Sequence, residues 1–101
     1  MFRLPWVTER RTIYLASDEA GLEVVLREVE GDLVEDRALT AGATAAGGVY
    51  EGRSTQRGQT TFWFNGDPVR LEWALRPAYR HVTVLRVVQR TERGEAQEVR
   101  W

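Results

Sequence analysis

The chain has 101 residues with 14 arginines, no lysine and 15 acidic side chains, which give a formal net charge of -1. Its apolar content of 43% is ordinary for a globular protein and argues against disorder. The absence of cysteine and the single histidine, His81, exclude disulfides, thiolate metal sites, cysteine nucleophiles and pairs of imidazoles. No apolar run approaches the roughly 20 residues that span a bilayer, and the apolar N-terminal stretch is too short for a signal peptide. We therefore expect a cytoplasmic protein with no membrane partner.

The first third of the chain predicts a strand followed by a helix. β-branched and aromatic residues over 6–16 favour a strand. Ser17 is a typical N-cap, and apolar residues recur at three- and four-residue spacing from Leu22 to Val29. This pattern predicts an amphipathic helix over 18–30, which Gly31 would end. Residues 33–40 favour a short strand, and an extension of the helix is the alternative.

The remainder of the chain predicts a loop and then a series of strands. The glycine- and alanine-rich residues 41–48 predict a flexible loop, and they match neither phosphate-binding nor dinucleotide-binding loop patterns. Strands are expected over 49–56, 60–64, 69–75, 80–90 and 96–101, with a hairpin turn at Asn65-Gly66. We therefore predict a single α+β domain, in which one helix packs on a curved, mostly antiparallel sheet of five to seven strands and 49–101 forms a β-meander.

Few residues suggest catalysis. Ser54 and His81 could in principle belong to a triad, but Ser54 lacks the Gly-x-Ser-x-Gly turn of a nucleophile. Asp32, Glu35 and Asp36 are close in sequence but lack the spacing of a calcium loop, so we interpret them as solvated charge. We expect no enzymatic activity, no metal and no cofactor.

The uneven distribution of charge suggests a first binding surface. Residues 17–39 carry eight acids and two arginines, whereas residues 40–101 carry nine arginines and six acids. The predicted helix would present its acids to solvent on one face, and this face would attract a partner protein with a basic patch. The candidate residues on this acidic surface are Asp18, Glu19, Glu23, Glu30 and Asp32.

The aromatic and basic residues suggest a second surface, on the sheet. Successive strand residues point to opposite faces, so one of the aromatic residues over 62–64 must leave the helix-covered face. We expect Trp63 on the open face together with Arg70 and Arg76. Arginines alternating with aromatic residues on a sheet are also typical of single-stranded nucleic-acid binding. The arginines considered for this face are Arg53, Arg57, Arg70, Arg76, Arg80, Arg86 and Arg90.

The sequence thus leads to a hypothesis of a non-enzymatic protein–protein interaction domain, such as an inhibitor, immunity protein or adaptor. The partner would be another protein that contacts either the helix face or the sheet face. Single-stranded nucleic-acid binding is the alternative hypothesis. Capture of a small ligand between helix and sheet, and homodimerisation through an edge strand, are two further alternatives.

Overall fold

A computed structural model describes residues 10–14, 20–90 and 95–99. Within these residues, the chain forms six strands and three helices. They are β1 (Arg10–Tyr14), β2 (Gly21–Arg27), α1 (Glu28–Gly31), α2 (Asp36–Ala45), β3 (Val49–Gln56), β4 (Gln59–Asn65), α3 (Pro68–Tyr79), β5 (Val84–Arg90) and β6 (Glu95–Val99).

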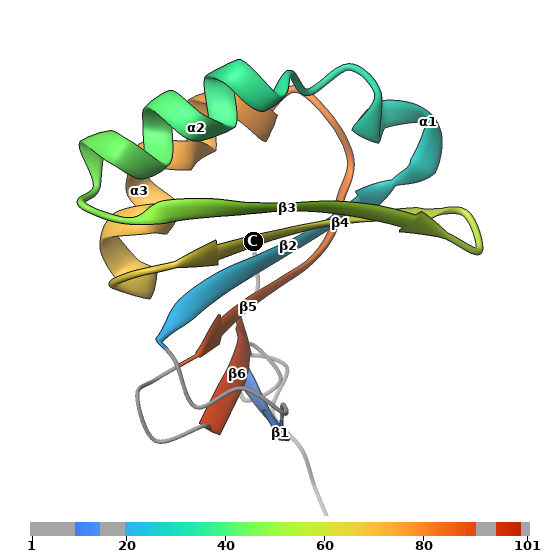
Figure 1. Cartoon of the computed structure of the whole chain (residues 1–101). Coiled ribbons are helices and arrows are strands. Elements are labelled where there is room, and N and C mark those ends of the chain that lie inside the picture. The colour runs from blue at the N-terminus through green and yellow to red at the C-terminus, as the bar shows by residue number, and fades with distance from the viewer. Residues whose placement is uncertain (1–9, 15–19, 91–94, 100–101) are drawn as a thin grey trace, which may run out of the picture.

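The six strands form one sheet in the order β1-β6-β5-β2-β4-β3, and all neighbouring strands are antiparallel. The central part, from β2 to β5, follows the β-α-β-β-α-β order of ferredoxin-like folds, in which β4 separates β2 from β3. Figure 1 shows α2 and α3 on the same face of this sheet. The prediction of an α+β domain on an antiparallel sheet is confirmed, whereas the prediction of a single helix is wrong.

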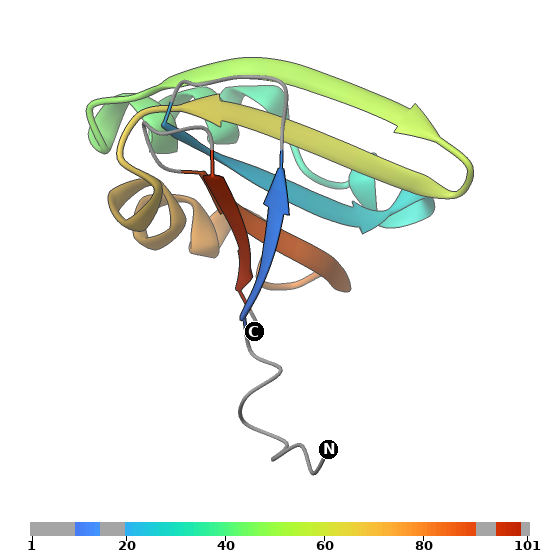
Figure 2. The ribbon, with the colours of Figure 1, turned by 90° about the horizontal axis from the view of Figure 1, so that it is seen from below.

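Figure 2 views the sheet from the side opposite to α2 and α3, and we call this side the open face. In this view β1 and β6 run at a steep angle to β3 and β4, as the twist that accumulates across a sheet leads one to expect. The helices α2 and α3 lie behind the strands. The helices α2 and α3 therefore do not cover this side of the sheet.

The helix predicted over 18–30 is wrong, because residues 21–27 form β2, which lies between β4 and β5. Leu22, Val24 and Leu26 alternate along this strand and are fully buried under the helices. Val25 is also buried, on the open face. A strand buried on both faces has a continuous apolar run, which can be mistaken for a helix stripe.

Residues 68–79 form α3 instead of the predicted strand over 69–75. Asp67 is its N-cap, and its carboxylate accepts hydrogen bonds from the main-chain N–H groups of Val69 and Arg70 (3.0 and 3.3 Å). Pro68 occupies the first helical position, where a missing N–H costs nothing. The buried apolar residues then follow helical spacing: Leu71, Leu75 and Tyr79.

Residues 36–45 form α2, so the strand predicted over 33–40 is wrong, and the loop predicted over 41–48 is wrong for 41–45 and confirmed only for 46–48. Leu39 and Ala43, four residues apart, are buried against the core. Gly42 allows α2 to approach α3, because a Cβ at this position would lie 2.9 Å from Leu75 Cδ2 and 3.2 Å from the Ala74 carbonyl oxygen. Small residues thus bring the two helices together.

The tight hairpin joins β3 to β4 at Arg57-Gly58 rather than at the predicted Asn65-Gly66. Arg57 and Gly58 have φ angles of 52° and 78°, as expected for the type I′ turn that suits twisted strands. The strands predicted over 49–56, 60–64 and 80–90 correspond to β3, β4 and β5, and the described part of the strand predicted over 96–101 lies in β6. The turn predicted at 92–95 lies mostly outside the described residues.

The core lies between the sheet and the helices. Phe62 and Phe64 of β4 and Tyr79 of α3 are its largest fully buried side chains. The ring centroids of Tyr50 and Phe64 lie 5.2 Å apart, so the edge strand β3 also contributes to the core. Burial of a large apolar side chain stabilises a fold by about 1.5–3 kcal/mol.

Candidate functional site

The acidic residues predicted to share one helix face do not form such a face, because β2 replaces that helix. Asp18 and Glu19 lie outside the described residues. Glu23 lies half-buried on the open face of the sheet. Burial raises the pKa of its carboxyl group, while the positive charges of Arg86 and Arg90 act in the opposite direction.

Glu30 and Asp32 lie at one end of the sheet, in α1 and directly after it. The Glu30 carboxylate accepts hydrogen bonds from the main-chain N–H and the hydroxyl of Thr83 (2.6 and 2.9 Å). These bonds connect α1 to the segment that enters β5. Asp32 is exposed. The structure therefore separates Glu23 from Glu30 and Asp32 by placing them on different elements.

The residues predicted to lie together on the open face of the sheet are also separated in the structure. Trp63 lies on the open face of β4, partly exposed, as expected. Arg70 and Arg76 belong to α3, which covers the opposite face of the sheet. The other arginines considered for this face are dispersed as well: Arg53 lies on the helix side of β3, Arg57 in the hairpin turn, Arg80 after α3, and Arg86 and Arg90 on the open face of β5.

Positive and negative groups alternate on the open face. Asn65 links two charged residues, because its side-chain amide donates to Glu51 (2.7 Å) and its oxygen accepts from Arg90 (3.4 Å). Arg90 crosses Gly21 to reach Asn65, since a Cβ on Gly21 would lie 2.8 Å from the Arg90 guanidinium. Glu23 adds a further acid beside Trp63. Among the side chains that the structure describes, this face therefore has no continuous basic track.

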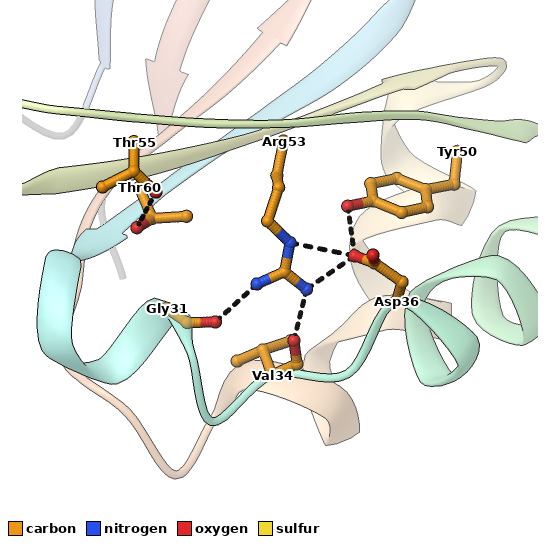
Figure 3. A network of polar contacts seen from close by, with 7 residues as sticks. All are labelled: Gly31, Val34, Asp36, Tyr50, Arg53, Thr55 and Thr60. Atoms are coloured by element: carbon orange, nitrogen blue, oxygen red, sulfur yellow. Dashed lines mark hydrogen bonds and ion pairs between the residues drawn. The ribbon is translucent and has the colours of Figure 1, made fainter.

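A polar network fixes the segment between α1 and α2 to the sheet (Figure 3). The guanidinium of Arg53 donates twice to Asp36 Oδ1, from Nε and Nη2 (2.9 and 2.6 Å). It also donates to the carbonyl oxygens of Gly31 (2.8 Å) and Val34. The hydroxyl of Tyr50 donates to the same Asp36 oxygen (2.7 Å). One arginine thus holds three points of the segment.

These bonds change the acidity of the residues involved. The hydrogen bond from Tyr50, followed by the hydrogen bonds from Arg53, lowers the pKa of Asp36 below its ordinary value. Burial, followed by the bond to Asp36, raises the pKa of Tyr50, so its hydroxyl remains a donor. Arg53 also lies over the ring of Phe62, 4.7 Å from its centroid. The network thus holds the start of α2 and the segment before it against β3.

The outer side of α3 presents an exposed surface of apolar and basic residues. Trp73 is 71% exposed and Val69, one turn earlier, is 52% exposed. Pro77 continues this spacing and is exposed. We define the α3 surface as Val69, Arg70, Trp73, Arg76, Pro77 and Arg80.

Arg76 connects the α3 surface to the interior. Its guanidinium lies over the ring of Trp73, 5.4 Å from the centroid, and forms an ion pair with Glu72 (3.1 Å). The other carboxylate oxygen of Glu72 accepts a hydrogen bond from Gln89 of β5 (3.0 Å). Glu72 is buried and its charge is directed inward. Glu72 is the only acidic residue of α3. Because it points inward, the exposed charges of the α3 surface are positive.

A second exposed cluster lies around α1. Val29 and Leu33 are 76% and 73% exposed, four residues apart. Exposed acids flank them, and residues 28–36 contain five acidic side chains and no basic one. We define the acidic corner as Glu28, Val29, Asp32, Leu33 and Glu35. Figure 1 shows α1 at the end of the sheet opposite to the start of α3.

Comparison with known proteins gives no match: no family model, curated protein or solved structure is significantly similar to the chain. In the part of the chain that the structure describes, no helix is long and apolar enough to cross a membrane. The described His, Asp and Glu residues also form no group of three that could hold a metal ion.

The sequence pattern predicts Trp73 in a strand and groups it with Tyr50 and the aromatic residues over 62–64 as a candidate sheet surface, so the α3 surface was not predicted. A signal was present, because Val69, Trp73 and Pro77 recur every four residues and arginines surround them. That signal has meaning only if residues 68–79 are helical. Asp67-Pro68, an N-cap followed by a first-turn proline, could have indicated this helix.

Proposed function

We propose that this protein is a non-enzymatic protein-binding domain, of the type used by inhibitors, immunity proteins and adaptors. In this proposal the α3 surface binds an acidic segment of a partner protein. The observation that supports it is the 71% exposure of Trp73 between arginines of the same helix. A cytoplasmic location, expected from the sequence, is part of the proposal.

Trp73 has the properties of an interface anchor. Tryptophan and arginine are enriched among the residues that contribute most to binding energy. Exposure of a large apolar side chain gives no stability to the free protein, but its burial against a partner gives about 1.5–3 kcal/mol. Because Arg76 lies over the Trp73 ring and is itself held by Glu72, part of the ordering cost of the anchor is already met.

The charge of the α3 surface indicates the chemistry of the partner. Arg70, Arg76 and Arg80 surround the apolar residues, while Glu72 is directed toward Gln89 in the interior. A partner with carboxylates around an apolar side chain would satisfy both features. The partner's acids would form bidentate pairs with the guanidiniums of Arg70 and Arg80, since that of Arg76 is paired with Glu72, and the partner's apolar group would pack on Trp73.

Nucleic-acid binding through the sheet is less well supported, because its arginine row is dispersed over both faces and the turns. Glu23 and Glu51 lie on the same open face as Trp63 and would repel phosphates. The arginines of α3 could attract a phosphate backbone, so an oligonucleotide belongs in the test as a competing ligand.

A peptide-display selection tests the proposal and does not require an identified partner. Random peptides are selected on the wild-type protein and then on Trp73→Ala. Val49→Ala is the matched control, because Val49 is 58% exposed but lies on the edge strand β3. A labelled single-stranded oligonucleotide is titrated in parallel at low salt.

The proposal predicts that the selected peptides combine Asp or Glu with an aromatic or large aliphatic residue. It also predicts that they bind Val49→Ala as well as wild type but bind Trp73→Ala at least tenfold more weakly. Enrichment of basic peptides, or equal binding to Trp73→Ala, would overturn it. Tight, salt-dependent binding of the oligonucleotide, without selection of acidic peptides, would instead establish a nucleic-acid-binding protein.

A further inference from the structure

We infer that a second copy of this chain is a partner of the α3 surface, and that this copy binds through its acidic corner. The inference rests on the proposed function, because it uses the same α3 surface and names one occupant for it. It follows from a correspondence between two exposed surfaces of the same molecule.

The two surfaces have the same apolar spacing. Val69 and Trp73 lie four residues apart on α3, and Val29 and Leu33 lie four residues apart at α1. All four side chains are more than half exposed. Each pair thus forms a short apolar ridge, and the ridge of one copy could pack on the ridge of the other copy.

The two surfaces have opposite charges. Arginines surround the ridge on α3, whereas Glu28, Asp32 and Glu35 surround the ridge at α1. Guanidinium and carboxylate groups are well suited to form bidentate pairs. The net charge of the whole chain is only -1, so electrostatic repulsion between copies is weak.

The geometry favours contact between copies over contact within one chain. Figure 1 places α1 at the opposite end of the sheet from the start of α3. Both apolar pairs remain exposed in the single chain, so neither surface covers the other. The complementary contact is therefore available to a second molecule.

The acidic corner is held in place before any contact forms. Arg53 binds the carbonyl oxygens of Gly31 and Val34, on either side of Leu33 and Asp32. Glu30 binds Thr83 through both carboxylate oxygens. A corner fixed at these points loses little conformational freedom on binding.

Two different surfaces meet in this contact, so it is heterologous unless a two-fold axis allows both reciprocal contacts to form at once. A heterologous contact gives rings or open chains of copies, whereas the reciprocal arrangement gives a dimer. In either arrangement, self-association should increase with protein concentration and weaken as the salt concentration rises.

Two surface variants test the inference by sedimentation velocity. The first, Arg70→Glu with Trp73→Ala, removes the α3 surface and keeps the acidic corner. The second, Glu28→Lys with Asp32→Lys, removes the acidic corner and keeps the α3 surface. Val49→Glu is the control, because Val49 is 58% exposed on β3 and belongs to neither surface. Thermal unfolding of each variant checks that the fold is intact.

We expect the wild type and Val49→Glu to associate at low salt as the concentration rises. Each surface variant alone should associate at least tenfold more weakly, and an equimolar mixture of the two should form a 1:1 complex through the one intact pair of surfaces. A wild type that stays monomeric up to about 1 mM would overturn the inference. Association of either variant as strong as that of the wild type would also overturn it, since the contact would then lie elsewhere, such as the β3 edge.

The outcome separates this inference from the proposed function. If the wild type is monomeric but binds acidic peptides through Trp73, the self-association fails and the proposed function stands. If acidic peptides do not bind either, both fail. If the mixture forms the 1:1 complex, the acidic corner is a ligand of the α3 surface.

Discussion

Arg53 of β3 binds Asp36, 17 residues earlier in the chain, through two nitrogens of its guanidinium and a single carboxylate oxygen. The same guanidinium binds two main-chain carbonyl oxygens of the segment before Asp36. Four of its five N–H groups are therefore used. The sheet edge in this way fixes both the start of α2 and the acidic corner.

Loss of the Arg53 guanidinium should destabilise the fold. Arg53→Leu keeps an apolar stem beside Phe62 but removes all four hydrogen bonds, so we expect a loss of about 1.5–3 kcal/mol, the range for hydrogen bonds to charged groups. Urea denaturation measures the change. Arg37→Leu is the control and should change stability by less than about 0.5 kcal/mol, because an exposed ion pair contributes little. Equal stability of the two variants would show that the network does not hold the fold.

Asp36 should make stability depend on acid pH. Its folded-state pKa is lowered, so the ionised carboxylate stabilises the fold above the ordinary pKa of 3.8, and this contribution is lost as the pH falls through the folded-state pKa. Asp36→Asn should therefore be less stable than wild type at pH 7, and the difference should shrink below pH 3.8. Denaturation curves at pH 7 and pH 3 measure it. A difference that is independent of pH would argue against the carboxylate.

Glu23 should have the opposite effect. Its folded-state pKa is raised by burial, so the ionised form destabilises the fold at neutral pH, and this cost disappears as the pH falls through the folded-state pKa toward the ordinary value of 4.5. Glu23→Gln should thus be more stable than wild type at pH 7 and nearly equal to it below pH 4.5. If Glu23→Gln is less stable at pH 7, the attraction of Arg86 and Arg90 outweighs the desolvation.

Gly21 should tolerate no side chain. A Cβ there would lie 2.1 Å from the Phe64 carbonyl oxygen, which is backbone in the neighbouring strand. Gly21→Ala should cost about 3 kcal/mol, the upper part of the usual range for overpacking. Gly47 is the comparison, because it has a φ of 75° with open space around it. Gly47→Ala should cost about 1–2 kcal/mol, from the left-handed backbone alone. Equal losses in thermal denaturation would contradict the close contact at Gly21.

The sequence allowed the fold class and most strands to be predicted, but not the helices. Over residues 21–27, Leu22, Val25 and Leu26 fit a helix stripe while Leu22, Val24 and Leu26 fit strand alternation. Pairing on both sides, with β4 and β5, decides in favour of the strand. The adjacent β-branched pair Val24-Val25 was the local signal for it.

The two long helices were missed for different reasons. The segment of α2 contains glycine and threonine, which lower helix propensity, although alanine favours it. Its helical form depends on the burial of Leu39 and Ala43 against α3 and the sheet. Over residues 69–75 of α3, large apolar residues occupy every second position, so only the cap at Asp67-Pro68 distinguished a helix from a strand.

These errors determined what could be predicted of the candidate site. Trp63 was placed correctly on the open face because it lies in a strand that the sequence identified. Arg70 and Arg76 were grouped with it because α3 was taken for a neighbouring strand. The acidic corner was identified in part, through Asp32, since that residue is exposed in either fold.

The affinity of one selected acidic peptide for three proteins tests the central claim most directly. Isothermal titration calorimetry at low and high salt would give its Kd for the wild type, Trp73→Ala and the control Val49→Ala. The account predicts an unchanged Kd for Val49→Ala, a Kd at least tenfold higher for Trp73→Ala, and weaker binding to the wild type at high salt. A peptide that binds all three proteins equally would contradict the claim that the α3 surface is the binding site.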